Sequence, residues 1–321
     1  MQYRKLGRYG IKVSEVSLGG WLTHGRSIST EATRNIVHRA FDLGINFFDT
    51  ADVYHQGEAE LALATAIADL RRQDLVIATK CFFPFTGGVN DRGLSRKHIS
   101  ESVHASLKRL NVDYIDLMQF HRFDADTPLD ETVRAIDDLA RAGKVLYWGV
   151  SEWNAAQITD LVHTARSLNA LPPASNQPLY NMLHRSIEGG VIPTSEQFGL
   201  GQVVFSPLAQ GVLTGKYLPG QPAPEGTRAS DSNSNQFMGG VMTEEILTRV
   251  QQLKKYVEGE GFALPSFALA WCLRQRNVSS VIIGASRPEQ VDQNVIASGL
   301  AVAPEQFAHA EAILAGNVDA S

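Results

Sequence analysis

Short apolar runs alternate with longer amphipathic runs along most of this chain. A short apolar run bounded by turn residues is typical of a buried strand, and apolar residues at helical spacing are typical of an amphipathic helix. The alternation predicts eight strand-plus-helix units, mostly about 30 residues apart. The carboxyl ends of the predicted strands fall at Gly20, Asp49, Lys80, His121, Ser151, Gln177, Phe205 and Gly284.

Several of the predicted helices begin at residues that commonly cap or start a helix. Thr30 and Ser95 carry hydroxyls that can accept a hydrogen bond from the first helical turn, and proline at 128 or 288 suits a first helical position. The predicted helices cover residues 30–43, 57–70, 95–110, 128–142, 154–168, 187–198, 243–258 and 265–276, and a further one starts at Pro288.

Eight such units predict an α/β fold, a (β/α)8 barrel that forms a single domain over residues 1–321 with extra helices. A β-hairpin formed by residues 2–6 and 11–13 precedes it. The alternative, an open doubly wound sheet, would carry a G-x-G-x-x-G turn after an early strand. The glycines of residues 199–201 precede a strand instead, and residues 211–216 fall one residue short of a phosphate-binding P-loop pattern. The barrel is therefore the expected fold.

Composition restricts the class of partner. The formal net charge is -5, and charged residues make up 20% of the chain. A nucleic-acid partner is not expected, because a binding face would need concentrated lysine and arginine. The two cysteines, Cys81 and Cys272, lack metal-ligand spacing and suit buried thiols in a reducing compartment. No signal peptide or membrane span is predicted, so a cytoplasmic protein without a metal is expected.

Four chemically active side chains follow three successive predicted strands. Asp49, Lys80 and His121 stand at strand ends, and Tyr54 lies five residues beyond Asp49. Strand ends of a barrel converge on one mouth, so these four groups are expected to meet there. A lysine ammonium favours the phenolate of a nearby tyrosine. The set therefore predicts an acid that protonates a carbonyl oxygen, with Asp49 orienting Lys80 and His121 either bonding the substrate oxygen or sharing the proton.

Each of these residues also has an ordinary structural interpretation. Asp49 could cap a helix or form an ion pair with Lys80, Tyr54 could pack in a loop, and His121 could be a satisfied core histidine. Taken singly, these interpretations are at least as good as the catalytic ones. Their joint occurrence at one predicted mouth favours chemistry.

With these motifs in hand, nearly the whole chain resembles the aldo-keto reductase superfamily. Its sequence motifs, especially the one at residues 205–217, are more similar to the branch that contains potassium-channel β subunits and their bacterial relatives than to the mammalian aldose reductase branch. Channel β subunits carry Asn where this chain has His121, so His121 favours ordinary reductase activity, whereas Glu152 stands where some relatives have Arg or Asn. The motifs that carry the resemblance are GINFFDTADVY at 44–54, Lys80, His121 in DLMQFHRFD, YWGVSEW at 147–153, FSPLAQGVLTGKY at 205–217 and IIGASRPEQVDQN at 282–294.

The resemblance implies an NADPH site that lacks a Rossmann turn. Ser151 and Gln177 would bond the nicotinamide carboxamide, and Phe205 would stack on the ring. The segment that includes Lys216 would follow the pyrophosphate, and the segment around Arg287 would hold the 2'-phosphate and adenine; both cations offer charge to phosphate. The implied cofactor residues are Gly20, Trp21, Asp49, Ser151, Gln177, Phe205, Ser206, Leu208, Gly211, Lys216, Ser286, Arg287, Gln290 and Asn294.

The predicted function is NADPH-dependent reduction of aldehydes or ketones, with Tyr54 as proton donor. One alternative is an NADPH-binding, redox-sensing regulatory subunit of a channel or other partner. Another is a barrel lyase or isomerase that uses Lys80 as a Schiff base. The oligomeric state is open, a homo-oligomer included, and residues 208–242 could form a lid. Candidate substrate-pocket residues, each of which could equally be packing, are Trp21, His24, Phe82, Phe83 and Trp153.

Overall fold

The computed structural model describes residues 1–21, 28–231, 235 and 238–317. Its barrel strands are β3 (Val16–Gly19), β4 (Phe47–Asp49), β5 (Val76–Cys81), β6 (Ile115–Phe120), β7 (Val145–Ser151), β8 (Ser175–Gln177), β9 (Gly201–Val204) and β10 (Val278–Ile283). They close in the order β10-β3-β4-β5-β6-β7-β8-β9, and every neighbouring pair is parallel. The predicted (β/α)8 barrel is confirmed.

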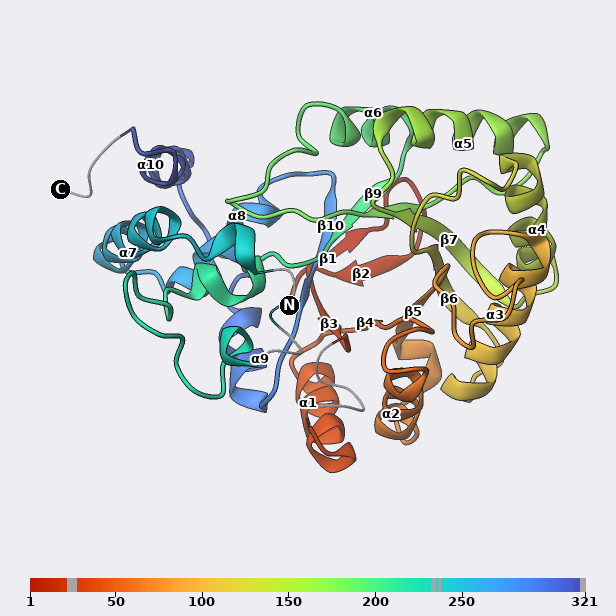
Figure 1. Ribbon diagram of the computed structural model, residues 1–321, viewed down its shortest axis with the longest axis horizontal. Coiled ribbons are helices and arrows are strands. Elements are labelled where there is room, and N and C mark those ends of the chain that lie inside the picture. Colours follow the sequence, from red (N-terminus) through yellow and green to blue (C-terminus); the bar gives the residue numbers. More distant parts are fainter. Residues whose placement is uncertain (22–27, 232–234, 236–237, 318–321) are drawn as a thin grey trace.

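Helices surround the strands, and most helices that neighbour one another around the barrel pack together (Figure 1). They are α1 (Thr30–Asp42), α2 (Glu58–Ile67), α3 (Arg96–Leu110), α4 (Leu129–Arg141), α5 (Ala155–Ser167), α6 (Val191–Phe198), α7 (Glu244–Gly259), α8 (Leu264–Leu273), α9 (Pro288–Val295) and α10 (Pro304–Ala315). α7 and α10 pack against each other at the left of Figure 1 and lie outside the eight-unit repeat.

Several predicted boundaries are corrected by hydrogen bonds that the sequence pattern does not reveal. Ser29, and not Thr30, caps α1, because its side chain accepts a hydrogen bond from the amide of Ala32. β4 begins at Phe47, although Ile45 is also apolar, since Asn46 is occupied in binding the hairpin. α6 begins at Val191, after the glycines at 189 and 190.

Three further differences concern the second half of the chain. β9 ends at Val204, one residue before the expected strand end at Phe205, and β10 ends at Ile283, one residue before the expected end at Gly284. The helix expected at 265–276 is α8, which ends at Leu273. The possible lid, residues 208–242, contains the 3-10 helices η3 (Ala209–Thr214), η4 (Arg228–Ser230) and η5 (Gly239–Val241).

Alternate residues of each strand face the barrel interior, and this decides which side chains form the mouth. Phe47 of β4 and Ala78 of β5 belong to a buried apolar cluster inside the barrel. Two residues further along the same strands stand Asp49 and Lys80. Because side chains alternate with a period of two, these polar groups continue the interior series toward the carboxyl ends. The interior is thus apolar at one end and polar at the other.

The predicted N-terminal hairpin closes the apolar end. Its strands are β1 (Tyr3–Lys5) and β2 (Lys12–Ser14), which pair antiparallel. Leu6 and Val13 join the interior cluster, so the hairpin acts as a plug. The interior cluster comprises Leu6, Val13, Phe47, Val76, Ala78, Leu117, Ala174, Val203 and Ile282.

Among the described residues, no helix is long and apolar enough to cross a membrane. No cluster of three or more His, Cys, Asp or Glu side chains suited to a metal ion is found in that part of the chain either.

The hairpin plug can be tested through its glycines. Gly7 has a left-handed φ of 56°, and a Cβ there would lie 2.7 Å from the amide nitrogen of Gly201. At Gly10 an added Cβ would meet no atom within 4 Å, and the backbone φ is not left-handed. Gly7→Ala should therefore lower the free energy of unfolding by about 2–4 kcal/mol, from backbone strain and overpacking.

Urea denaturation measures this loss, with Gly10→Ala as the matched control. Equal stability of the two variants would contradict the account of the plug.

Candidate active site

The mouth brings the predicted acid together around one buried ammonium. Lys80 is fully buried, and its Nζ donates to Asp49 Oδ2 at 2.6 Å and to the Thr50 carbonyl at 2.7 Å. A third contact joins Lys80 Nζ to the Tyr54 hydroxyl at 3.3 Å. All three N–H bonds of the ammonium therefore have partners, and one of those partners is the phenol.

Burial and charge act in opposite directions on this pair. Burial alone would lower the pKa of Lys80, but the Asp49 carboxylate and the Tyr54 hydroxyl outweigh it and leave that pKa above its ordinary value. Burial raises the pKa of Tyr54, and the Lys80 ammonium opposes that rise without cancelling it. The effect of Lys80 on the pKa of Tyr54 thus has the expected direction, but burial has the larger effect. Tyr54 is therefore held as a protonated phenol.

Two glutamine amides hold Asp49 from the other side. Gln177 Nε2 donates to Asp49 Oδ1 at 2.8 Å, and Gln119 Nε2 lies 3.4 Å from the same oxygen. Gln119 was not predicted as a site residue. Gln119 lies two residues after the interior residue Leu117 and two before His121. The period-two alternation of strand side chains therefore marks Gln119 as an interior residue.

His121 lies beside the phenol, in an aromatic wall. Its ring centroid is 5.8 Å from that of Tyr54 and 5.0 Å from that of Phe83, both in edge-on geometry. Burial, with the charges of Lys80 and Arg122, holds the pKa of His121 well below its ordinary value. Its Nδ1 is buried and has no hydrogen-bond partner among the described residues. The imidazole is thus held neutral beside the phenol.

The aromatic residues proposed for a substrate pocket divide into two groups. The rings of Trp21 and Phe83 lie beside Tyr54 and His121 respectively. Trp153 is 1% exposed and packs edge-on against Phe123, so it is a core residue here. Phe82 is buried against Phe83, and His24 lies outside the described residues.

The residues expected at the nicotinamide end share one hydrogen-bonded framework. The Ser151 hydroxyl donates to the Gln177 carbonyl at 2.9 Å, and the Phe205 amide donates to the Pro178 carbonyl at 3.1 Å. Gly20, at the end of β3, donates its amide to the Asp49 carbonyl at 2.9 Å. These contacts place the ends of β3, β4, β7, β8 and β9 around the same mouth.

The expected phosphate segments have features that fit an anionic cofactor. Gly211 has a φ of 95°, and a Cβ there would lie 3.3 Å from Lys216 Nζ, so the glycine lets the ammonium approach the backbone after Leu208. On the β10–α9 connection, the Ser286 amide donates to Gln290 Oε1 at 2.7 Å. Arg287 is exposed beside them, and Asn294 is buried further along α9.

Strained backbone gathers at this mouth. Eight described non-glycine residues have left-handed φ values; of these, Asn111 and Asn169 follow helices, where asparagine is common. The remaining six lie on the loops after β4, β7 and β9, and such strain persists at functional sites because surrounding contacts hold it. They are His55, Gln56, Glu152, Ser206, Ala209 and Gln210.

Three more residues at the mouth were not predicted to contact the site. Glu152 Oε1 accepts a hydrogen bond from the Leu179 amide at 2.6 Å, so its carboxylate braces the loop after β8. The Arg228 guanidinium lies 4.8 Å from the Trp21 ring centroid, and burial lowers the pKa of Arg228 to about 10. Asn181 bonds the Ser206 carbonyl. No motif or period marks Arg228, which begins the short 3-10 helix η4.

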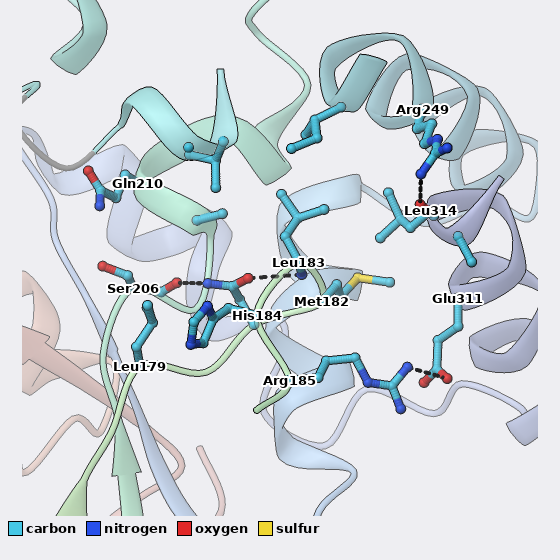
Figure 2. A pocket seen from close by; sticks show the side chains of 16 residues that line it. Leu179, Met182, Leu183, His184, Arg185, Ser206, Gln210, Arg249, Glu311 and Leu314 are labelled. Atoms are coloured by element: carbon cyan, nitrogen blue, oxygen red, sulfur yellow. Dashed lines mark hydrogen bonds and ion pairs between the residues drawn. The ribbon is translucent and has the colours of Figure 1, made fainter. Parts of the chain in front are cut away.

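A cavity of about 550 Å³ lies beside this mouth, behind the loop that follows β9 (Figure 2). None of the four predicted catalytic residues lines it. Figure 2 shows Ser206 and Gln210 on one side of the space and Arg249 and Leu314 on another. The cavity therefore adjoins the expected cofactor segment and not the acid.

The structure is thus a parallel eight-stranded barrel with an interior Asp-Lys-Tyr set and a neutral histidine at the carboxyl ends of its strands. The chain belongs to the Aldo/keto reductase family, whose model matches residues 15–315. This family carries out nicotinamide-dependent carbonyl oxidoreduction.

Curated relatives align over most of the chain. A probable voltage-gated potassium channel subunit beta of Arabidopsis thaliana is 43% identical over 298 residues, which cover 92% of this chain and 90% of the relative. The protein of the same description from Oryza sativa subsp. japonica is 42% identical, with the same coverage. A putative voltage-gated potassium channel subunit beta of Schizosaccharomyces pombe is 45% identical over 301 residues, covering 91% and 87% respectively.

The buried neutral state of His121 predicts a pH effect on stability. The unfolded chain binds a proton at this imidazole near its ordinary pKa of 6.5, whereas the native protein binds it only at lower pH. As pH falls below 6.5, the unfolded state takes up more protons and this residue's contribution to stability is lost. Wild type should therefore lose stability on acidification relative to His121→Asn.

Urea unfolding of both proteins across that pH range measures the difference. Parallel stability curves for the two would show that His121 titrates normally in the native protein.

Proposed function

We propose that this protein reduces aldehydes or activated ketones with NADPH and that Tyr54 is the proton donor. The observation that carries the proposal is the contact of the Tyr54 hydroxyl with the buried, charged Lys80, 3.3 Å away. The Tyr54 phenol keeps its proton until negative charge develops on the substrate oxygen beside it. The adjoining ammonium then stabilises the phenolate that remains.

Bound NADPH would supply the hydride for the carbonyl carbon. Tyr54 gives its hydroxyl proton to the carbonyl oxygen as charge builds there, and Lys80 offsets the charge left on the phenol oxygen. Asp49 keeps Lys80 protonated and fixed in place. His121, which is neutral and lies beside the Tyr54 ring, orients the substrate oxygen by a hydrogen bond.

The framework around the mouth supports NADPH as the cofactor. Lys216 and Arg287 offer positive charge to phosphates, and Arg287 also supports a preference for the 2'-phosphorylated form. The residues proposed to hold the cofactor are Gly20, Trp21, Asp49, Ser151, Gln177, Phe205, Ser206, Leu208, Gly211, Lys216, Ser286, Arg287, Gln290 and Asn294.

The side chains at the mouth also favour one class of substrate and disfavour one alternative mechanism. The rings of Trp21 and Phe83 favour apolar or aromatic carbonyl compounds. A Schiff-base role for Lys80 is disfavoured, because its pKa is raised and its three N–H bonds are already donated, whereas a nucleophilic amine must be neutral. A cytoplasmic location and a homo-oligomeric state stay predictions.

Turnover of 4-nitrobenzaldehyde, followed by NADPH absorbance, tests this proposal. Tyr54→Phe removes the proton donor and should lower kcat by about 100-fold or more. Tyr147→Phe is the matched control, since Tyr147 packs edge-on against Tyr9 of the hairpin, at the plugged end. It should retain wild-type kcat, and equal activity of Tyr54→Phe and wild type would refute the assignment of the acid.

The names of the relatives favour a second candidate, an NADPH-binding regulatory subunit that senses redox state on a partner. Such a protein would bind NADPH tightly but turn over a panel of aldehydes negligibly, with or without Tyr54→Phe. Turnover of wild type that depends on Tyr54 would instead support the reductase.

A further inference from the structure

Asn181, which no motif singles out, ties together two loops at the mouth. Its side chain is 2% exposed. Nδ2 donates to the Ser206 carbonyl at 2.9 Å, and Oδ1 accepts from the Leu183 amide at 2.9 Å. Both bonds appear as dashed lines beside Ser206 and Leu183 in Figure 2. One buried amide thus joins the loop after β8 to the loop after β9.

The Ser206 carbonyl is held by two donors. Besides Asn181, the Ala209 amide donates to it at 2.9 Å. A carbonyl oxygen has two lone pairs, so this pair of bonds uses its full capacity and fixes its direction. The hydrogen bond from Asn181, which lies outside this loop, thereby helps to fix the plane of the peptide that follows Ser206.

This loop needs such support because its backbone is strained. Ser206, Ala209 and Gln210 have φ values of 50°, 46° and 59°, in the left-handed region that residues with a Cβ disfavour. The same three residues line the cavity, so their cavity side faces open space instead of packed side chains. The hydrogen bond from Asn181 therefore stabilises this strained backbone, whereas packed side chains stabilise the backbone elsewhere in the barrel.

We propose that Asn181 is a positioning residue that presets residues 205–211 in the conformation that receives the cofactor. This inference rests on the proposed function, since that segment contains Phe205, Ser206, Leu208 and Gly211. The predicted consequence is a cofactor site that is ordered before the cofactor arrives. Loss of the tie would then weaken binding by making ordering part of the binding step.

Asn46 provides a matched control at the plugged end of the barrel. Its Nδ2 donates to the Lys12 carbonyl at 3.0 Å, and its Oδ1 accepts from the Ser14 amide at 2.8 Å. It therefore also ties two backbone groups, but in the hairpin. Replacing either asparagine by aspartate keeps the acceptor and removes the donor.

Asn181→Asp should raise the NADPH dissociation constant about tenfold, which corresponds to about 1.4 kcal/mol, whereas Asn46→Asp should leave it within about twofold of wild type. Fluorescence titration with NADPH measures both. Amide hydrogen exchange without NADPH gives a second readout. Exchange at Ala209 and Gly211 should rise in Asn181→Asp and not in Asn46→Asp.

The outcomes separate the two proposals. An Asn181→Asp dissociation constant no higher than that of Asn46→Asp, or unchanged exchange at residues 205–211, would overturn this inference alone. Failure of wild type to bind NADPH would overturn the proposed function and the cofactor role of Asn181 with it. Weakened binding together with faster exchange supports the inference.

Discussion

The ion pair between Asp49 and Lys80 is the contact on which the mouth depends. A fully buried ammonium is costly to remove from water, and its stability here requires a carboxylate at 2.6 Å and two further acceptors. An apolar pair of similar volume would often serve stability as well or better. Retention of the charge fits a chemical role, which is to stabilise an anion that forms on Tyr54.

The barrel supplies this pair with its surroundings. The same alternation that sends Phe47 and Ala78 into the apolar interior sends Asp49 and Lys80 into the polar end. The hairpin fills the apolar end, where Leu6 and Val13 join the interior cluster. Strained loops after β4, β7 and β9 then surround the opening, held by side chains such as Glu152 and Asn181.

Much of this arrangement could be predicted from the sequence. Apolar runs at regular spacing indicated eight strands and the barrel, because period and spacing are local properties of the chain. The meeting of Asp49, Lys80 and Tyr54 followed from the rule that strand ends converge. Helix α3, with its Ser95 cap, was also predicted correctly, since capping is a local interaction.

The remaining features depend on contacts between distant segments. The late start of β4 and the bond from Asn181 to Ser206 each need a partner whose place is set only by the fold. The net rise in the pKa of Tyr54 likewise depends on burial, which outweighs the charge of Lys80. Arg228 reaches Trp21 from a long loop that no periodic pattern describes.

The central claim is that Lys80 acts electrostatically on Tyr54. The most direct test is the titration of Tyr54 by NMR with ring-labelled tyrosine, in wild type and in the neutral double variant Asp49→Asn with Lys80→Met, which avoids an unpaired buried charge. The account predicts a higher Tyr54 pKa in the double variant than in wild type, because the ammonium that favours the phenolate is gone. An unchanged or lower pKa would contradict it.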